Sequence, residues 1–178
     1  ESQLTGSSKE HYLNEINDVI NNSTFTYVRQ KQRLGLGHAI LSGEPLIGNE
    51  VFAVILADDL CIGSKVGVMS QMIEVYQQYK CSVIAIEEVP TDQTSKYGII
   101  KGKQINDSKN LFIVSDMVEK PNANNAPSNM AIVGRYILTP DIFNILKNTQ
   151  ADKNGEIQIT DALKIQAKKG KVIAYKFQ

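Results

Sequence analysis

VFAVILADD, at residues 51–59, is the stretch that decides the fold class: a run of six apolar residues, 51–56, is followed by Ala57 and then by two adjacent carboxylates. A continuous apolar run of this length predicts a strand buried on both faces, as in a parallel sheet covered by helices. In open sheets of this kind, ligands bind beyond the carboxyl ends of the strands. Asp58 and Asp59 lie at such a position, just after the predicted strand. A carboxylate there either ligates a hard cation such as Mg²⁺ together with substrate phosphates, or simply caps a helix or reaches solvent.

Hydrophobic periodicity extends this pattern in both directions along the chain. Besides residues 51–56, strands are predicted at residues 24–28, 82–86, 99–105, 111–118, 130–138 and 172–176. Helices are predicted at residues 9–20, 35–41, 68–79, 141–147 and 160–168. The strands at 99–105 and 111–118 form an antiparallel pair around the polar turn 106–110. The alternation predicts an α/β fold with a mixed, mostly parallel sheet and flanking helices, built as a single domain over residues 1–178.

Composition excludes several classes of function. The 178 residues are 42% hydrophobic and 21% charged, and 19 Lys and Arg balance 19 Asp and Glu. A net charge of zero argues against a surface that binds nucleic acid or anionic membranes. Cys61 and Cys81 lack metal-ligand spacing, and no apolar run is long enough to cross a bilayer. We therefore expect a cytoplasmic protein with reduced cysteines.

Polar residues at strand ends give three further candidate motifs. Gln30 ends a predicted strand before the glycine-rich turn that starts at Gly35, and a side-chain amide can read a nucleobase edge, although the turn could be a plain connection. Glu119 and Lys120 end another strand; they could bind sugar hydroxyls and a phosphate, or form an exposed ion pair. Acidic groups at residues 155–162 crowd a helix start, which capping alone could explain.

Together and in this order, the motifs resemble the bacterial UTP–glucose-1-phosphate uridylyltransferases, also called UDP-glucose pyrophosphorylases. The matching stretches are VRQ (28–30), GLGHA (35–39), VILADD (54–59), YGII (97–100), VEKP (118–121), APSNMAIVGRY (126–136) and GEIQITDA (155–162). The resemblance covers nearly the whole chain from about Lys9. It implies a Rossmann-like nucleotide-diphospho-sugar transferase fold, incomplete at both ends.

The resemblance also assigns roles to residues. On the nucleotide side, Gln30 and Gly35 would contact the uracil. Asp58 would ligate Mg²⁺ beside the ribose and phosphates, with Asp59 as the alternative ligand. On the sugar side, the groups that would hold glucose or its phosphate are the backbone of Gly98, the Glu119 carboxylate, the strand at Val133 and Gly134, and the Lys120 ammonium. Glu156 and Gln158 would approach the same side of the cleft, and His38 would be structural.

The reaction implied is transfer of a uridylyl group from UTP to glucose 1-phosphate, giving UDP-glucose and pyrophosphate. The attacking phosphate is already ionised, so catalysis would be positioning and charge neutralisation by Lys120, Asp58 and Mg²⁺. Partners are then these substrates and products, with no nucleic acid or membrane, and a homo-oligomer in the intact enzyme. Two alternatives remain open: a sister pyrophosphorylase using another base or sugar, and a non-catalytic sugar-nucleotide-binding fragment.

Two parts of the family pattern do not occur within the 178 residues. The glycine-rich phosphate loop would lie before Glu1, and a second metal-binding aspartate would follow Gln178. Because that loop cradles the triphosphate, we expect the chain to be part of a longer enzyme and to have little activity alone. Its sheet would also be less stable, or would borrow a strand from a neighbouring chain.

Overall fold

A computed structural model describes residue 6 and residues 11–61, 66–106 and 108–177. The helices are α1 (His11–Asn21), α2 (Gly35–Ser42), α3 (Glu44–Ile47), α4 (Val68–Tyr79), α5 (Asp141–Lys147) and α6 (Ile159–Lys168), with short 3₁₀ turns η1 (Thr91–Lys96) and η2 (Ala123–Asn125). The strands are β1 (Phe52–Ile55), β2 (Ser82–Glu88), β3 (Gly98–Gln104), β4 (Leu111–Glu119), β5 (Met130–Leu138) and β6 (Val172–Lys176). No helix in these ranges is long and apolar enough to cross a membrane.

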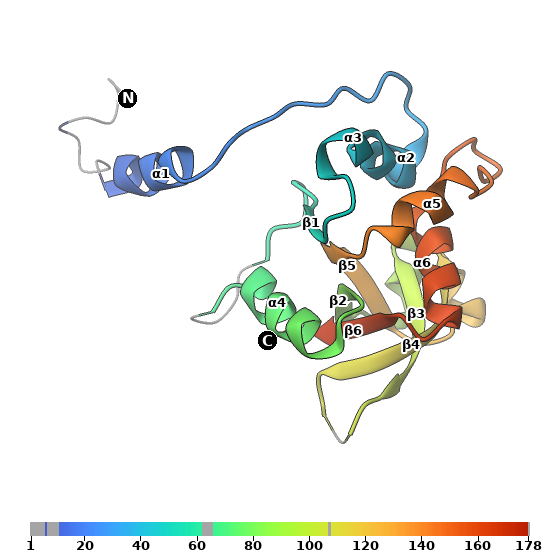
Figure 1. Cartoon of the computed structure of the whole chain (residues 1–178). Helices are drawn as coiled ribbons and strands as arrows, with labels where there is room; N and C mark the ends of the chain where they lie inside the picture. The colour runs from blue at the N-terminus through green and yellow to red at the C-terminus, as the bar shows by residue number, and fades with distance from the viewer. Residues whose placement is uncertain (1–5, 7–10, 62–65, 107, 178) are drawn as a thin grey trace.

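The strands form a single six-stranded sheet in the order β1-β5-β2-β6-β4-β3, and β5 also pairs with β3 (Figure 1). The pair β2–β6 is parallel, and the other pairings of the described strands are antiparallel. The sheet is therefore mixed, as predicted, but the prediction that it is mostly parallel is wrong for the pairings of the described strands. β1, β2, β3 and β6 share one direction, but neighbouring strands are mostly antiparallel because β5 and β4 run the opposite way between them.

Two apolar layers cover the sheet. On one face α2, α5 and α6 pack on alternate residues of β5, among them Ile132, Tyr136 and Leu138. On the other face α4 packs on the intervening residues Val133 and Ile137. The period-2 alternation of a strand thus sends successive β5 side chains to different layers. This alternation decides which β5 residues can reach the candidate site.

Several elements match the sequence prediction closely. The predicted bounds of α4, α5, β5 and β6 are the observed ones, and β3 and β4 form the expected antiparallel pair. The turn after α6 contains Gly170 at a φ of +69°, a conformation that glycine adopts without steric cost. Strong periodicity and clear stop signals made these elements predictable.

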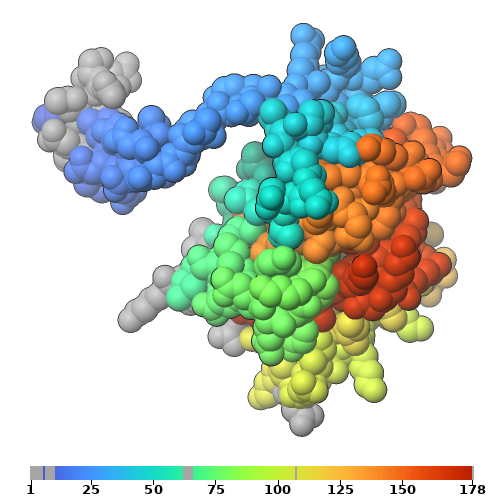
Figure 2. Space-filling model, viewed as in Figure 1, coloured from blue at the N-terminus to red at the C-terminus, as the bar shows by residue number. Residues whose placement is uncertain are grey.

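Residues 24–28 were predicted as a strand, and that prediction is wrong. The segment is an extended chain with no strand partner among the described residues, and Phe25, Tyr27 and Val28 are exposed. β-branched and aromatic residues favour a strand only where a neighbouring strand pairs with them. α1 and this segment stand away from the sheet and its helices (Figure 2). α1 begins at His11; the predicted start at Lys9 lies outside the described residues.

β1 is not buried on both faces, contrary to the prediction. Its residues alternate between half-buried and exposed, and Ile55 is 58% exposed. The inward-facing Phe52 stacks on Phe143 of α5 with ring centroids 5.0 Å apart. β1 pairs with β5 alone in the described part of the sheet and therefore lies at its edge, where one face lacks a covering helix.

Candidate active site

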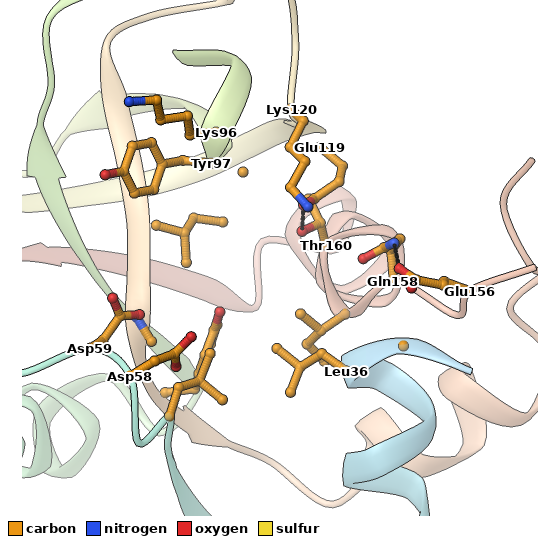
Figure 3. A pocket seen from close by; sticks show the side chains of 17 residues that line it. Leu36, Asp58, Asp59, Lys96, Tyr97, Glu119, Lys120, Glu156, Gln158 and Thr160 are labelled. Atoms are coloured by element: carbon orange, nitrogen blue, oxygen red, sulfur yellow. Dashed lines mark hydrogen bonds and ion pairs between the residues drawn. The ribbon is translucent and has the colours of Figure 1, made fainter. Parts of the chain in front are cut away.

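A cavity of about 480 Å³ opens on the face of the sheet that carries α2 and α6. It collects most of the candidate residues from distant parts of the chain: Gly35, Asp58, Gly98, Glu119, Lys120 and Gly134, together with Asp59, Glu156 and Gln158. Figure 3 shows Asp58 and Asp59 across the cavity from Glu119 and Lys120. Asp58, Gly98, Glu119 and Lys120, which we expected to share one cleft with Gln30, do line it, whereas Gln30 does not.

Glu119, at the end of β4, is held from two sides. The hydroxyl of Thr160, itself only 3% exposed at the start of α6, donates to Glu119 Oε2 at 2.6 Å. Gly98 lies opposite in the ladder, and a Cβ there would stand 3.2 Å from both Glu119 Oε2 and Thr160 Oγ1. Because Gly98 has no side chain, the space beside the Glu119 carboxylate and the Thr160 hydroxyl stays open. Thr160 bonds to Glu119 Oε2, so Glu119 Oε1 can accept a hydrogen bond from a ligand.

Lys120 occupies an uncommon backbone conformation for a lysine. Its φ is +46°, and its N–H donates to the carbonyl of Tyr97 at 2.9 Å. Non-glycine residues in this region cost free energy and often mark functional sites. The ammonium lies 3.7 Å from Glu119 Oε1 and is 59% exposed, so it is available to an anion in the cavity.

The two aspartates after β1 have different environments. Asp59 accepts a hydrogen bond from the Gly134 N–H at 2.7 Å, which ties the turn to β5. In the described part of the chain no side chain or backbone group bonds to the Asp58 carboxylate, which points into the cavity (Figure 3). No cluster of three or more metal-ligating side chains occurs in the described ranges. A single free carboxylate fits Mg²⁺, which is usually held by one or two carboxylates plus substrate phosphates.

The glycine-rich turn at the start of α2 packs directly against the segment that leads into α6. Gly37 donates to the Ile157 carbonyl at 2.9 Å, and Ile157 donates to the Leu34 carbonyl at 2.8 Å. A Cβ at Gly37 would lie 2.7 Å from the Ile157 oxygen, and one at Gly35, whose φ is +85°, 2.9 Å from Glu156 Cβ. The glycines therefore allow the close approach that brings Glu156 and Gln158 to the cavity.

The same segment is organised by Asp152. Its carboxylate accepts hydrogen bonds from the N–H groups of Asn154 and Glu156 at 2.8 and 3.0 Å and from the Gln158 amide at 3.0 Å. The hydrogen bond from Glu156, followed by that from Gln158, lowers the pKa of Asp152 below its ordinary value. An ionised Asp152 thus shapes the wall of the cavity.

Two predicted residues do not line the cavity. Gln30 donates to the Gly35 carbonyl at 3.2 Å and lies 2.8 Å from His38 Nδ1, so it stands beside the cavity wall and His38 holds it there. Val133 is buried on the opposite face under α4, because β5 alternates, and Ile132 lines the cavity instead. A side-chain contact from Val133 is therefore excluded by the strand's register.

Sequence reasoning missed four residues with polar side chains that line the cavity: Lys96, Tyr97, Tyr136 and Thr160. Tyr136 could have been found, because it lies two residues after Gly134 on the same strand and so faces the same side. Burial raises its pKa, with Glu119 and Asp59 adding to the effect, so the hydroxyl stays protonated and can donate. Lys96 is the last residue of η1, a 3₁₀ turn that no sequence signal indicated.

The cavity thus combines an anchored carboxylate that can accept hydroxyl protons, an exposed ammonium and a free carboxylate suited to a cation. A ligand with hydroxyls and phosphates matches this set of groups.

The chain is similar in sequence and fold to known proteins. A UTP–glucose-1-phosphate uridylyltransferase of Pseudomonas aeruginosa is 55% identical over 179 residues, covering 100% of this chain and 63% of that protein. One of Staphylococcus epidermidis is 40% identical and covers 100% of this chain and 61% of its own length. A crystal structure of a UDP-glucose pyrophosphorylase complexed with UDP-glucose superposes with a TM-score of 0.92 at 56% identity, covering 97% of this chain and 65% of that one.

The chain therefore spans less than two thirds of the length of these relatives. The mixed α/β fold predicted from the sequence is the one they share. The model of the family described as "Nucleotidyl transferase" matches residues 4–178, so the chain belongs to the nucleotidyl transferase family.

Proposed function

We propose that this chain carries the nucleotide and sugar-phosphate site of a uridylyltransferase that converts UTP and glucose 1-phosphate to UDP-glucose and pyrophosphate. The observation that carries the proposal is the cavity in which Glu119, Lys120 and Asp58 meet. It supplies a hydroxyl acceptor, a phosphate-binding cation and a metal-binding carboxylate within about 480 Å³. The relatives' names give the identity of the sugar and the base.

In the proposed reaction a phosphate oxygen of glucose 1-phosphate attacks the α-phosphorus of UTP. A new P–O bond forms, the bond to the β-phosphate oxygen breaks, and pyrophosphate leaves with the electron pair. No protein nucleophile is needed, since the attacking phosphate is ionised at neutral pH. Mg²⁺, when bound, neutralises phosphate charge.

The chain's own residues bind and orient. Glu119, fixed by Thr160, accepts hydrogen bonds from sugar hydroxyls over the floor at Gly98. Lys120 holds the sugar phosphate, and Asp58 would hold the cation. On the nucleotide side Gln30 and Gly35, already linked by a hydrogen bond, would contact the uracil.

The test is calorimetric titration of the chain with UDP-glucose, dTDP-glucose and ADP-glucose in the presence of Mg²⁺. We expect UDP-glucose to bind most tightly. Lys120→Ala should weaken it by at least about tenfold, because a hydrogen bond to a charged group is worth about 1.5–3 kcal/mol. Lys101→Ala, which removes an exposed lysine of β3 outside the cavity, is the matched control. Equal affinity for the three sugar nucleotides, or an unchanged Lys120→Ala, would contradict the proposal.

A further inference from the structure

Arg135 has no role in the proposed chemistry, yet it is a buried charge beside the site. It lies in β5 between Gly134 and Tyr136, and only 8% of it is exposed. Its neighbours on the strand line the cavity, so the alternation of β5 sends the Arg135 side chain to the opposite face. It is therefore not placed to touch a substrate in the cavity.

The guanidinium is satisfied by backbone carbonyls. Nη1 donates to the carbonyls of Leu56 at 3.0 Å and Gly134 at 2.9 Å, and Nη2 donates to the carbonyl of Asp59. No carboxylate of the described residues lies within ion-pair distance of it. Because this buried guanidinium donates its hydrogen bonds to main-chain carbonyls, it fixes the path of the backbone that carries them.

The carbonyls that Arg135 binds lie at the two ends of one turn. Leu56 is the first residue after β1, and Asp59 closes the turn three residues later. The same turn is tied to β5 by Leu56 N–H to the Gly134 carbonyl at 2.9 Å and by Gly134 N–H to the Asp59 carboxylate at 2.7 Å. Both ends of the turn are thus held, whereas no hydrogen bond among the described residues engages the Asp58 carboxylate, which faces the cavity (Figure 3).

We propose that Arg135 is a positioning residue: from the far face of the sheet it clamps both ends of the Leu56–Asp59 turn and presets the Asp58 carboxylate for a divalent cation. The inference rests on the proposed function for the identity of the cation. A planar guanidinium suits the task because its two terminal nitrogens reach different carbonyls, which a lysine ammonium at the end of a flexible stem does not reproduce.

Two measurements on the full chain test the clamp and the cation separately. Hydrogen exchange of a peptide covering residues 53–61 reports the turn, and electron paramagnetic resonance of Mn²⁺ in the presence of UTP reports the cation. Arg135→Met should speed exchange in the turn and weaken Mn²⁺ binding by about tenfold, the lower end of the effect of removing groups that orient metal ligands. Arg135→Lys should fall between wild type and Arg135→Met.

Gln166→Met is the matched control. Gln166 is fully buried and joins Ser82, Thr139 and Asp141 by hydrogen bonds, so its loss disturbs a buried polar network that does not touch the turn. We expect it to leave turn exchange and Mn²⁺ affinity within twofold of wild type. If Arg135→Met behaves like Gln166→Met in both measurements, the inference is overturned.

Asp58→Asn separates this inference from the proposed function. It should abolish Mn²⁺ binding and leave exchange in the turn unchanged, because its carboxylate has no partner in the described structure. If wild type binds no Mn²⁺ with UTP at millimolar concentration, or Asp58→Asn binds it normally, the metal role of the turn fails, and the proposed function loses that support. Exchange in Arg135→Met still decides whether Arg135 holds the turn.

Discussion

The two sides of the cavity are built in different ways. On the sheet side, Gly98, Glu119 and Gly134 lie in or at the ends of strands, and their partners are a neighbouring strand, the Thr160 hydroxyl and the Asp59 carboxylate. On the proposed nucleotide side, Gln30 stands beside the cavity wall at the end of an extended segment that has no strand partner among the described residues. Two side-chain contacts attach it, to Gly35 and His38. The sheet therefore fixes the proposed sugar-phosphate groups, whereas the proposed base contact depends on local hydrogen bonds.

The largest effect is expected at Gly134 on the sheet side. A Cβ at this position would lie 2.6 Å from Leu56 Cβ and 2.8 Å from Leu56 Cγ, well inside contact distance. Gly134→Ala must therefore displace β1 or the turn after it. We expect a loss of about 3 kcal/mol in the free energy of unfolding, as for severe overpacking, measured by urea denaturation.

Gly67→Ala is the control for that change, because a Cβ there meets no atom within 4 Å and its φ of −60° suits alanine. It should change stability by less than about 1 kcal/mol. A Gly134→Ala variant as stable as Gly67→Ala would show that the sheet side is looser than the comparison states.

The next effect concerns the hydrogen bond from Thr160 to Glu119. Thr160→Val keeps the shape of the side chain and removes the donor, which leaves a half-buried carboxylate oxygen without its 2.6 Å partner. We expect a loss of about 1.5 kcal/mol in the free energy of unfolding and weaker UDP-glucose binding. Thr91→Val, at an exposed threonine, is the control and should leave stability and affinity nearly unchanged. If Thr160→Val matches Thr91→Val in both quantities, Thr160 has no role in the site.

The sequence predicted the sheet side of the site better than the nucleotide side. Glu119 and Lys120 were found because an apolar strand visibly ends there, and β5 because its apolar run ends before Pro140. The segment at residues 24–28 has equally good strand residues, but a strand needs a partner, and no local pattern states whether one is present. Tertiary pairing, which residue type does not encode locally, accounts for that error.

The absence of Val133 from the cavity lining has a different cause. The motif located the correct strand, but a one-residue difference along a strand moves a side chain to the other face. Thr160 was predicted only as the first residue of a helix, although its hydroxyl contacts Glu119, a residue 41 positions earlier. A contact of this kind, between segments distant in the sequence, becomes evident only when the fold is known.

On the nucleotide side, Gln30→Ala should leave the free energy of unfolding within about 0.5 kcal/mol, since the residue joins no core cluster. It should weaken UDP binding by about three- to tenfold, the value of one hydrogen bond, and reduce the preference for UDP over CDP. Calorimetric titration of both nucleotides measures this. Gln32→Ala, at the exposed neighbour, should change neither quantity; a large stability loss in Gln30→Ala would mean that both sides are anchored alike.

The smallest expected effect tests the sheet side by pH. Asp116 of β4 and Lys164 of α6 form an ion pair at 2.9 Å, which joins the strand that ends at Glu119 to the helix that begins beside Thr160. The hydrogen bond from Lys164 lowers the pKa of Asp116 below its ordinary value of 3.8. A depressed carboxyl pKa stabilises the fold above that ordinary value, and the contribution is lost as the pH falls through the lower folded-state pKa. Because 40% of the Asp116 side chain is exposed, solvent screening limits the pair to about 0.5 kcal/mol.

A double-mutant cycle with Asp116→Asn and Lys164→Met, followed by urea denaturation, should show this coupling at pH 7 and none near pH 2. Coupling that persists near pH 2, or that survives 1 M salt undiminished, would contradict an ion pair and point to packing between β4 and α6 as the link.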